Sequence, residues 1–309
     1  MIITVTWNPA LDYGISLAQL RRGDIQRFGQ GVFTPGGKGV NVSLLLTSLG
    51  VENRAVGIAA GFTGREILRQ LESAGCTADF VLLERGESRL NVKFTEADGT
   101  ETAFNGGGPE IPDQAVDQLL SKLDSLSGED LLVLSGSLPQ GLPETAFPKL
   151  LEKARRARAR LVVDMSGDPL LASLPYRPFL IKPNGEELAE LFGIEGSPSL
   201  LEAADCAGRL QRMGARNVLV SLGGKGALLL EEGGRRLYCH AVRGEMVSTV
   251  GAGDSMVAGF LYGMELHGTL EGGLRWGTAA GAATAFQQGI ASGERVKALF
   301  AAVENPHLV

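Results

Sequence analysis

The chain has 309 residues, of which 44% are hydrophobic and 21% charged, a composition that supports a large buried core and argues against a disordered protein. Its net charge of −6 argues against a nucleic-acid-binding surface, which needs clustered positive charge. The three cysteines have no metal-ligand spacing, and the first residues lack the basic and long apolar segments of a signal peptide or membrane helix. We therefore expect a cytoplasmic protein with reduced thiols that contacts neither membranes nor nucleic acid.

Short apolar runs alternate along the chain with segments of helical period. The runs predict strands at residues 2–7, 131–135, 161–164, 179–182, 218–221 and 227–230. The segments between them predict helices at residues 42–49, 65–73, 114–123, 143–158, 186–192 and 200–213. Strands that are apolar on both faces predict an α/β fold, with a mainly parallel sheet covered by helices on both sides. No linker or repeat divides residues 1–309, so we expect a single domain.

Two segments in the first third of the chain interrupt this alternation. Residues 24–34 and 88–104 look like antiparallel ribbons, because Leu90, Val92 and Phe94 alternate with polar residues and Asp98-Gly99 supplies a hairpin turn. Together they predict a small second sheet that acts as a lid over a site. An edge hairpin without function is the alternative.

The most informative segment is Gly251-Ala252-Gly253-Asp254, followed by small and apolar residues at helical spacing. A glycine-rich turn that opens a helix exposes consecutive backbone N–H groups at the positive end of the helix dipole, which suits a phosphoryl group in transfer. Asp254 is placed to take the proton of the attacking nucleophile. The alternative is an ordinary glycine turn in which Asp254 caps the helix.

A second glycine-rich helix entrance lies at Gly36-Gly37-Lys38-Gly39-Val40-Asn41. It is not a phosphate-binding Walker A loop, because no Ser or Thr follows the lysine. Its backbone can approach a polyol closely, with Asn41 at the hydroxyls and Lys38 at a phosphate. A tight turn with an exposed lysine is the alternative.

Polar residues also follow several of the predicted strands, where loops of a parallel sheet line the ligand crevice. Asp12 follows the first strand, and Ser137 follows the strand at residues 131–135. Asn184 and Glu187 suit a magnesium–ATP complex or a helix-capping box, and the two interpretations are compatible. A glycine-rich turn that can hold nucleotide phosphates, or serve only as a hairpin turn, joins two strands at Ser221-Leu222-Gly223-Gly224-Lys225-Gly226.

Taken together, the segment from Gly36 to Asn41 and residues 249–260 resemble the paired signatures of the PfkB family of ribokinase-like sugar kinases. The segments 8–12, 135–139, 182–187 and 221–226 match in order and spacing, so the resemblance covers nearly the whole chain. Three further segments resemble the branch of 1-phosphofructokinases and tagatose-6-phosphate kinases: Asn8-Pro9-Ala10-Leu11-Asp12, Gly86-Glu87-Ser88-Arg89 and Gly108-Pro109-Glu110-Ile111.

The resemblance implies a three-layer α/β/α fold with a small β lid inserted at about residues 12–34 and 88–106. It also implies transfer of the ATP γ-phosphoryl group to a primary hydroxyl, with Mg²⁺, in a homodimer whose lids pack together. Asp254 would be the base, and the backbone of Gly251, Ala252 and Gly253 the anion hole. The remaining roles fall to three groups of residues: the sugar to Asp12, Gly36, Gly37, Asn41 and Ser137; its phosphate to Lys38, Arg89 and Arg27; and Mg–ATP to Asn184 and Glu187 (through water), Lys182, Ser221, Gly223, Gly224 and Gly226.

The sequence leaves the substrate open among fructose 1-phosphate, tagatose 6-phosphate and fructose 6-phosphate, in that order of preference. A sugar-phosphate sensor and a nucleotide-binding scaffold on the same fold are further alternatives. The intact Gly251–Asp254 segment argues against the sensor, and Asp12, Asn41 and Arg89 argue against the scaffold. Lys225 and Trp7 depart from the family pattern, and no role is predicted for them.

Overall fold

The computed structural model describes all 309 residues, which form two sheets and ten α-helices. The strands of the large sheet are β1 (Ile2–Thr6), β4 (Asn53–Ala60), β5 (Thr77–Leu83), β8 (Leu131–Ser135), β9 (Arg160–Asp164), β10 (Leu180–Ile181), β11 (Asn217–Ser221), β12 (Gly226–Leu230), β13 (Arg236–His240) and β14 (His307–Leu308). Those of the small sheet are β2 (Ala10–Leu17), β3 (Val32–Gly36), β6 (Arg89–Glu96) and β7 (Glu101–Asn105). The helices are α1 (Lys38–Leu49), α2 (Gly61–Ser73), α3 (Asp113–Ser121), α4 (Ala146–Ala157), α5 (Gly167–Ser173), α6 (Gly185–Phe192), α7 (Leu200–Arg212), α8 (Ala252–His267), α9 (Leu270–Ala285) and α10 (Gly293–Phe300).

The large sheet is parallel over most of its width. Its strand order is β14-β13-β12-β11-β10-β9-β8-β1-β4-β5. All neighbours from β5 to β11 pair in parallel, and β12, β13 and β14 extend the sheet in antiparallel fashion. The predicted α/β fold with a mainly parallel sheet is confirmed.

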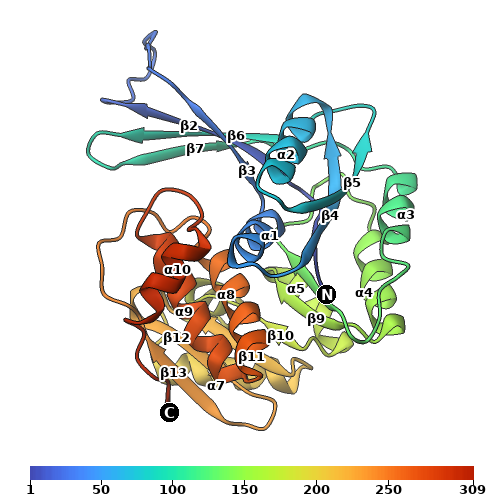
Figure 1. Cartoon of the computed structure of the whole chain (residues 1–309), viewed down its shortest axis with the longest axis vertical. Helices are drawn as coiled ribbons and strands as arrows, with labels where there is room; N and C mark the ends of the chain where they lie inside the picture. The colour runs from blue at the N-terminus through green and yellow to red at the C-terminus, as the bar shows by residue number, and fades with distance from the viewer.

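Alternation along the strands sends apolar side chains to two separate cores. In β1, Ile3 and Val5 belong to a cluster of 38 buried residues, whereas Ile2 belongs to a second cluster of 27. Helices α3 to α7 contribute to the first cluster, and α1 and α8 to α10 to the second (Figure 1). The sheet is therefore the middle of three layers, as expected. None of the helices combines the length and hydrophobicity required to span a bilayer.

Each apolar cluster contains one of the three cysteines. Cys206 lies in the first cluster and Cys239 in the second. Cys76 lies in a third cluster of six residues, which α2 helps to form. All three thiols are free and buried.

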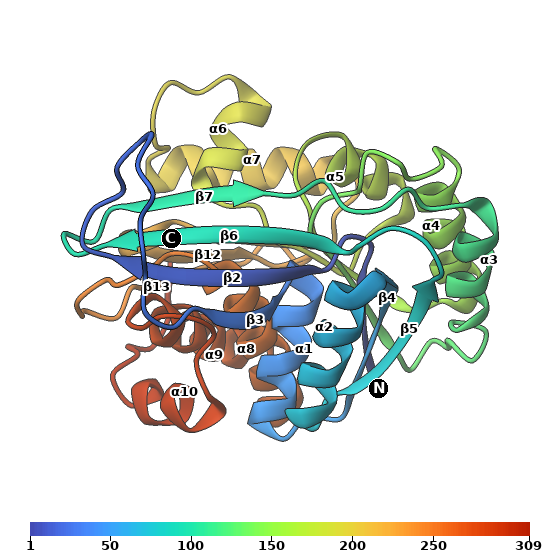
Figure 2. The same ribbon diagram turned by 90° about the horizontal axis from the view of Figure 1, so that it is seen from above.

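The small sheet extends beyond the body of the molecule, and its strands β2, β6 and β7 run side by side when seen from above (Figures 1 and 2). Its strand order is β3-β2-β6-β7, with Asp12 of β2 opposite Asn91 of β6. Because strand residues alternate between faces, Asp12, Asn91 and Lys93 share one face, which we call the inner face. Tyr13 and Phe33 lie stacked on the opposite, outer face, with ring centroids 4.3 Å apart.

The structure corrects the first lid segment. Residues 24–31 hold no strand, and β3 begins only at Val32, because Gly23, Gly29 and Gly31 interrupt this stretch. Asp12 was expected in a loop, but it lies within β2 and pairs with both neighbouring strands. The second segment forms the predicted hairpin of β6 and β7.

Candidate active site

Asp254 lies in the first turn of α8 at the carboxyl edge of the large sheet. The helix is preceded by Gly251, whose φ of +78° favours glycine, and no side chain caps the helix. The interpretation of Asp254 as an ordinary cap is therefore wrong. The Ala252 N–H donates to the Thr249 carbonyl at 3.3 Å, whereas the amides of Gly253 and Asp254 have no backbone acceptor and are available to an anion.

The carboxylate of Asp254 is buried and held by one neighbour. It is 6% exposed, and Asn41 Nδ2 of α1 donates a hydrogen bond to its Oδ2 at 2.7 Å. Burial and the nearby carboxylate of Asp164 raise the pKa of Asp254 to about 6, against the opposing effect of the Asn41 hydrogen bond. A carboxylate with such a pKa is ionised at neutral pH and is a stronger base than an exposed aspartate.

Asp164, at the end of β9, organises two lysines beside Asp254. Its Oδ1 lies 3.1 Å from Lys182 Nζ and 3.5 Å from Lys38 Nζ, and the side chain is 1% exposed. Burial opposes ionisation of Asp164, but Lys182 and Lys38 lower its pKa below the ordinary value. Burial also opposes the charge of Lys38, yet the carboxylates of Asp164, Asp254 and Glu187 raise its pKa.

Lys182, which the resemblance assigns to the nucleotide, lies against the predicted anion hole. The position that a Cβ on Gly253 would occupy is 3.2 Å from Lys182 Nζ. The ammonium group therefore lies against the turn that would bind a transferring phosphoryl group. Sequence reasoning missed Asp164, although it is the last residue of a correctly predicted strand.

The glycines of the second motif allow the small sheet to approach the body closely. A Cβ on Gly36 would lie 3.0 Å from Cγ of Asp12, and one on Gly37 would lie 3.1 Å from Cγ2 of Thr6. Gly37 also has a φ of +108°. These two glycines bring Asp12 next to the start of α1, where Lys38 and Asn41 lie one turn apart.

A polar cavity of about 400 Å³ adjoins Lys38 at the carboxyl ends of β1 and β8. It is lined by Thr6, Asn8, Lys38, Arg89, Ser135, Gly136, Ser137, Leu138, Ser166 and Pro169. Arg89 Nε and Ser135 Oγ are buried without hydrogen-bond partners, and Arg89 forms no ion pair. Burial lowers the pKa of Arg89, with Asp12 opposing. An anion in this cavity would satisfy unpaired donors, as expected for a substrate phosphate.

A second cavity, of about 470 Å³, reaches the other side of the α8 turn. It borders Gly253 and the turn that contains Ser221, Gly223, Gly224 and Gly226. Its wall elsewhere is largely apolar and includes small residues of α9 with Val242, Met246 and Phe286, and Arg243 also borders it. Such a slot suits a purine base, with its phosphates directed toward α8.

Asn184 and Glu187 form the capping box that was one of two predicted alternatives. Asn184 Oδ1 accepts from the Glu187 N–H, and Glu187 Oε2 accepts from the Asn184 N–H, both at 2.8 Å. Glu187 Oε1 is not used by the cap and lies 3.9 Å from Lys38 Nζ. One carboxylate oxygen therefore remains directed toward the lysine cluster.

Three residues considered from the sequence lie outside this cluster of side chains. Arg27 was expected at the sugar phosphate, but it is exposed in the loop between β2 and β3, forms no ion pair and does not line the cavity that contains Arg89. Lys225 Nζ contacts Ser197 Oγ and the Pro198 carbonyl at 3.5 and 3.4 Å. Trp7 is 3% exposed and belongs to the first apolar cluster.

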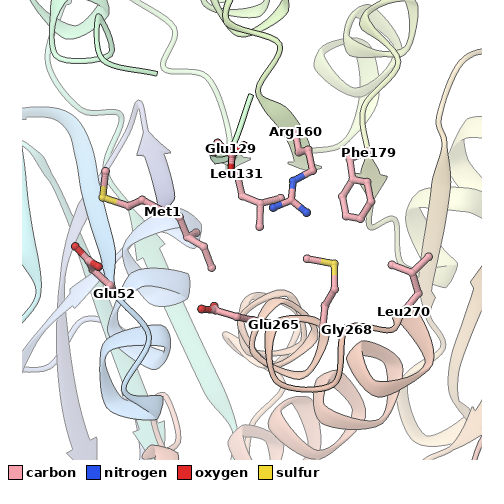
Figure 3. A pocket seen from close by; sticks show the side chains of 11 residues that line it. Met1, Glu52, Glu129, Leu131, Arg160, Phe179, Glu265, Gly268 and Leu270 are labelled. Carbon is pink, nitrogen blue, oxygen red and sulfur yellow. The ribbon is translucent and has the colours of Figure 1, made fainter. Parts of the chain in front are cut away.

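A cavity of about 570 Å³ at the opposite, amino-terminal edge of the strands is not part of this site (Figure 3). Glu52, Glu129 and Glu265 line it together with Arg160, whose guanidinium group makes no ion pair. Three carboxylates would repel the phosphates of a nucleotide or a sugar phosphate. The chemistry described above lies at the other end of the sheet.

Comparisons with known proteins agree with this geometry. Residues 10–296 match the family described as pfkB family carbohydrate kinase. The 1-phosphofructokinase of Bacillus subtilis is 39% identical over 98% of this chain and 99% of its own length. The D-tagatose-1-phosphate kinase of Bacillus licheniformis is 36% identical over 100% of both chains. The structure of Escherichia coli phosphofructokinase-2 in complex with fructose-6-phosphate has a TM-score of 0.89 at 29% identity, covering 97% of this chain and 98% of that chain. The chain therefore belongs to the pfkB family of carbohydrate kinases, and it is an ATP-dependent kinase of this family.

Proposed function

We propose that this kinase transfers the γ-phosphoryl group of ATP to the C6 hydroxyl of fructose 1-phosphate, which gives fructose 1,6-bisphosphate and ADP. The observation that carries the proposal is the first turn of α1. Its Asn41 binds the buried base Asp254, and its Lys38 lines the cavity in which Arg89 lacks an anionic partner. One helical turn thus connects a base for the hydroxyl with a cationic pocket for a phosphate on the same substrate.

In this mechanism Asp254 accepts the proton of the attacking hydroxyl as the oxygen approaches the γ-phosphorus. The amides of the Gly251–Gly253 turn and the Lys182 ammonium stabilise the charge that develops on the transferred group. Arg89 and Lys38 bind the phosphate already on the sugar, and Asp12 binds sugar hydroxyls. Removing the positioned base should lower turnover by roughly 100- to 10,000-fold.

Mg²⁺ accompanies ATP in this proposal, and the residues present fit it. Glu187 Oε1 is free of the capping box, and Asp164 Oδ2 has no hydrogen-bond partner, whereas Asp164 Oδ1 pairs with Lys182 and Lys38. The structure contains no group of three or more acidic, histidine or cysteine side chains suited to hold an ion alone. Mg²⁺ keeps several waters and binds mainly nucleotide phosphates, so water-mediated contacts with Glu187 and the Asn184 cap suffice. When bound, the ion neutralises phosphate charge.

The proposed assembly is a homodimer formed through the outer face of the small sheet. Phe33 and Phe104 are 42% and 59% exposed there, beside Tyr13 and Phe94. The edge strands β3 and β7 each have one unpaired side. A second copy of the same sheet would cover both features, and the sheet would then act as a lid over the sugar.

We also place this kinase in the cytoplasm. Its three cysteines are all free, which suits a reducing compartment. ATP and phosphorylated sugars are supplied in the same compartment.

Tagatose 1-phosphate is the second candidate substrate, favoured by the 36% identical relative named for it. It carries its phosphate on the same carbon as fructose 1-phosphate and differs only in the configuration at C4. Tagatose 6-phosphate and fructose 6-phosphate carry the phosphate at the other end, so the C1 hydroxyl would have to face Asp254. An intact base and anion hole do not suit a non-catalytic sensor.

The test is ADP release with Mg–ATP and each of five acceptors: fructose 1-phosphate, tagatose 1-phosphate, tagatose 6-phosphate, fructose 6-phosphate and ribose. We expect kcat/KM for fructose 1-phosphate to exceed that for fructose 6-phosphate about 100-fold, which corresponds to roughly 2.7 kcal/mol. The Asp254→Asn variant supplies the background rate. No release above that background with any acceptor would overturn the proposal.

A further inference from the structure

Two polar residues of β6 lie on the inner face of the small sheet and have no role in the mechanism so far. Asn91 Nδ2 donates to Asp12 Oδ1, and Lys93 Nζ donates to Asp12 Oδ2, both at 2.7 Å. The strand register explains the contact, because β2 pairs in parallel with β6 and places Asp12 opposite Asn91 and Gly14 opposite Lys93. Since Gly14 has no side chain, Lys93 has room to reach back to the carboxylate.

Asn91 has an unsatisfied acceptor. Its side chain is 6% exposed, and its Oδ1 is buried with no hydrogen-bond partner. Buried amide oxygens are almost always hydrogen-bonded, because losing hydration without replacement costs free energy. An acceptor left unpaired next to Asp12 therefore indicates a donor that arrives with a ligand.

Lys93 lies in the cleft between the two sheets. A cavity of about 480 Å³ is bounded by Lys93, Asp12 and Asn41, together with residues 288–290 and Ser248. Asn41 also donates the hydrogen bond to Asp254, so the side chain of Asn41 connects this cavity to the base. The Lys93 and Asp12 side chains are only 21% and 16% exposed, which limits screening of their ion pair.

The two contacts use one acceptor position on each oxygen of Asp12. A carboxylate has about four such positions, so one remains on each oxygen. The Lys93 ammonium and the Asn91 amide, one on each oxygen, also fix the plane of the carboxylate. Together with Asn91 Oδ1, the inner face then has three acceptor positions beside the remaining N–H groups of Asn91 Nδ2 and Lys93 Nζ, and this mixture is complementary to sugar hydroxyls, which both donate and accept.

We propose that Asn91 and Lys93 complete the sugar-binding site. Asn91 Oδ1 accepts a hydrogen bond from a sugar hydroxyl, and Lys93 is a positioning residue that acts through Asp12. This inference rests on the proposed function, because it takes the ligand to be a ketose phosphate. It adds two residues of the lid to the selection of hydroxylated substrates, separate from the phosphate contacts of Arg89 and Lys38.

The test for Lys93 is a double-mutant cycle with Asp12→Asn. In the otherwise native enzyme, Lys93→Met should raise KM for fructose 1-phosphate about tenfold while KM for ATP changes less than about twofold, and Lys93→Arg should recover most of the loss. In the Asp12→Asn background, Lys93→Met should have little further effect. Equal losses in the two backgrounds would overturn the positioning role. Lys122→Met removes a lysine–aspartate pair far from the site and serves as the control, with KM unchanged.

The test for Asn91 is calorimetric binding of fructose 1-phosphate to the full chain. Asn91→Ala should weaken binding of fructose 1-phosphate about tenfold. An analogue of fructose 1-phosphate that lacks the contacted ring hydroxyl should bind the native enzyme with a similar loss of affinity. The Asn91→Ala variant should bind that analogue no more weakly than the native enzyme does. Unchanged affinity of a folded Asn91→Ala variant would contradict the contact. Measurements on the native enzyme distinguish failure of this inference from failure of the proposed function. If the native enzyme turns over fructose 1-phosphate normally but the effects of the variants are additive, only this inference is rejected. If the native enzyme neither binds nor turns over any ketose phosphate, the proposed function is rejected and this inference with it.

Discussion

At the scale of single residues, the protonation of Asp254 depends on a balance between one carboxylate and two ammonium groups. Burial and Asp164 favour the neutral form of Asp254, whereas Asn41, Lys38 and Lys182 favour its charged form. Asp164 also binds both lysines, so it partly cancels their effect on Asp254. The base is consequently strong enough to take a proton and is still ionised at neutral pH.

The pKa of Asp254 predicts loss of activity in mild acid. The pKa is raised to about 6, so the protonated form, which cannot act as a base, accumulates as the pH falls through that value. At pH 5 only about one carboxylate in ten is ionised, and kcat/KM should be about tenfold below its plateau. Steady-state rates between pH 5 and 8 measure this, with circular dichroism to confirm that the protein stays folded. A level profile down to pH 5 would argue against Asp254 as the base.

The Asp164→Asn variant tests whether the charge of Asp164 contributes to the raised pKa of Asp254. Removing the neighbouring negative charge, while Lys38 and Lys182 stay cationic, should move the acid inflection of kcat/KM to lower pH. The variant should also lose about 3 kcal/mol of folding stability, because the buried ammonium group of Lys182 loses its carboxylate partner. An inflection that stays in place would mean that burial alone sets the pKa.

At the scale of elements, α8 and α9 pack so closely that glycines are required between them. A Cβ on Gly259 would lie 2.4 Å from the Trp276 carbonyl oxygen, and one on Gly277 would lie 2.9 Å from the Met256 carbonyl oxygen. These obstacles are backbone atoms, so they cannot turn aside as a flexible side chain would. The first turn of α8 carries Asp254, and its position therefore depends on this helix contact.

Gly259→Ala should destabilise the protein in spite of the better helix propensity of alanine. We expect a loss of about 1–3 kcal/mol from overpacking, together with reduced kcat as α8 is displaced. Gly208→Ala in α7 is the matched control, because its new Cβ would meet only a side-chain nitrogen of Arg212 at 3.6 Å. That change should be neutral or stabilise by up to about 1 kcal/mol. Chemical denaturation of both variants measures the difference, and equal effects would contradict the packing argument.

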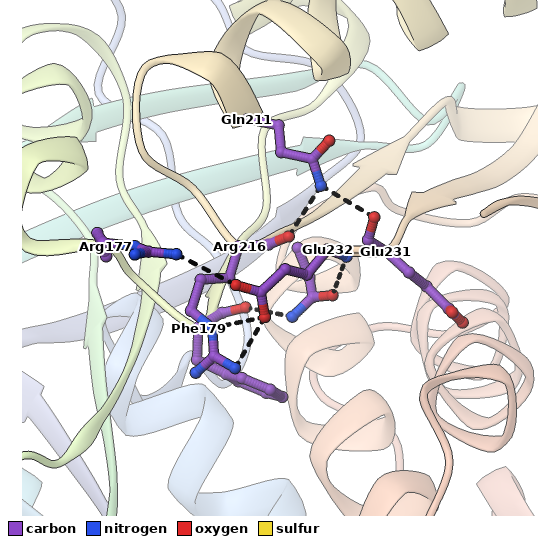
Figure 4. Close-up of polar contacts among 7 residues, drawn as sticks. Arg177, Phe179, Gln211, Arg216, Glu231 and Glu232 are labelled. Atoms are coloured by element: carbon purple, nitrogen blue, oxygen red, sulfur yellow. Dashed lines mark hydrogen bonds and ion pairs between the residues drawn. The ribbon is translucent and has the colours of Figure 1, made fainter. Parts of the chain in front are cut away.

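The shortest strand shows how side chains support an element that backbone pairing alone would leave weak. β10 has two residues, and Asn217 Nδ2 donates to the carbonyl of the preceding Phe179 at 2.7 Å. Asn217 Oδ1 also accepts from the Glu232 N–H at 2.9 Å, and Gln211 Nε2 donates to the Arg216 carbonyl at 3.0 Å (Figure 4). These contacts join the end of α7 and the β12–β13 turn to the middle of the sheet.

Sequence patterns located the strands whose residues are uniformly apolar and missed the strands that combine small, polar and apolar residues. The six predicted strands are present within one or two residues of their bounds, because they are apolar on both faces. β4 was missed, since its alanines and glycine have low strand propensity, and β5 lies at the sheet edge with both polar and apolar residues. Asp164 was missed for a different reason. Its importance comes from Lys38 and Lys182, which are distant in sequence and meet it only in the folded chain.

At the scale of the whole molecule, the two faces of the small sheet have opposite surface properties. The inner face of the small sheet is polar and adjoins the site, whereas its outer face exposes aromatic side chains. The body has buried its own apolar clusters behind helices. An apolar sheet face with open edges is therefore the part of this molecule best suited to bind a second copy.

Charged substitutions on that face should separate the subunits of the proposed homodimer. Phe33→Glu combined with Phe104→Glu should shift sedimentation of the purified protein from the proposed dimer toward monomer, because charges of one sign would repel each other and lose their hydration in the interface. Leu201→Lys is the control, since Leu201 is 72% exposed on α7, away from the small sheet. A native enzyme that sediments as a monomer at micromolar concentration would contradict the proposed assembly.

The distribution of one thiol to each apolar cluster has a practical consequence. Burial raises the pKa of Cys76, Cys206 and Cys239, so each thiol is both shielded and mostly protonated at neutral pH. A maleimide or disulfide reagent can reach one of them only when its own cluster opens. Three variants that each keep a single cysteine would therefore report, through their labelling rates, how often each apolar cluster opens. The same rates measured with bound substrate would show which cluster the substrate stabilises most.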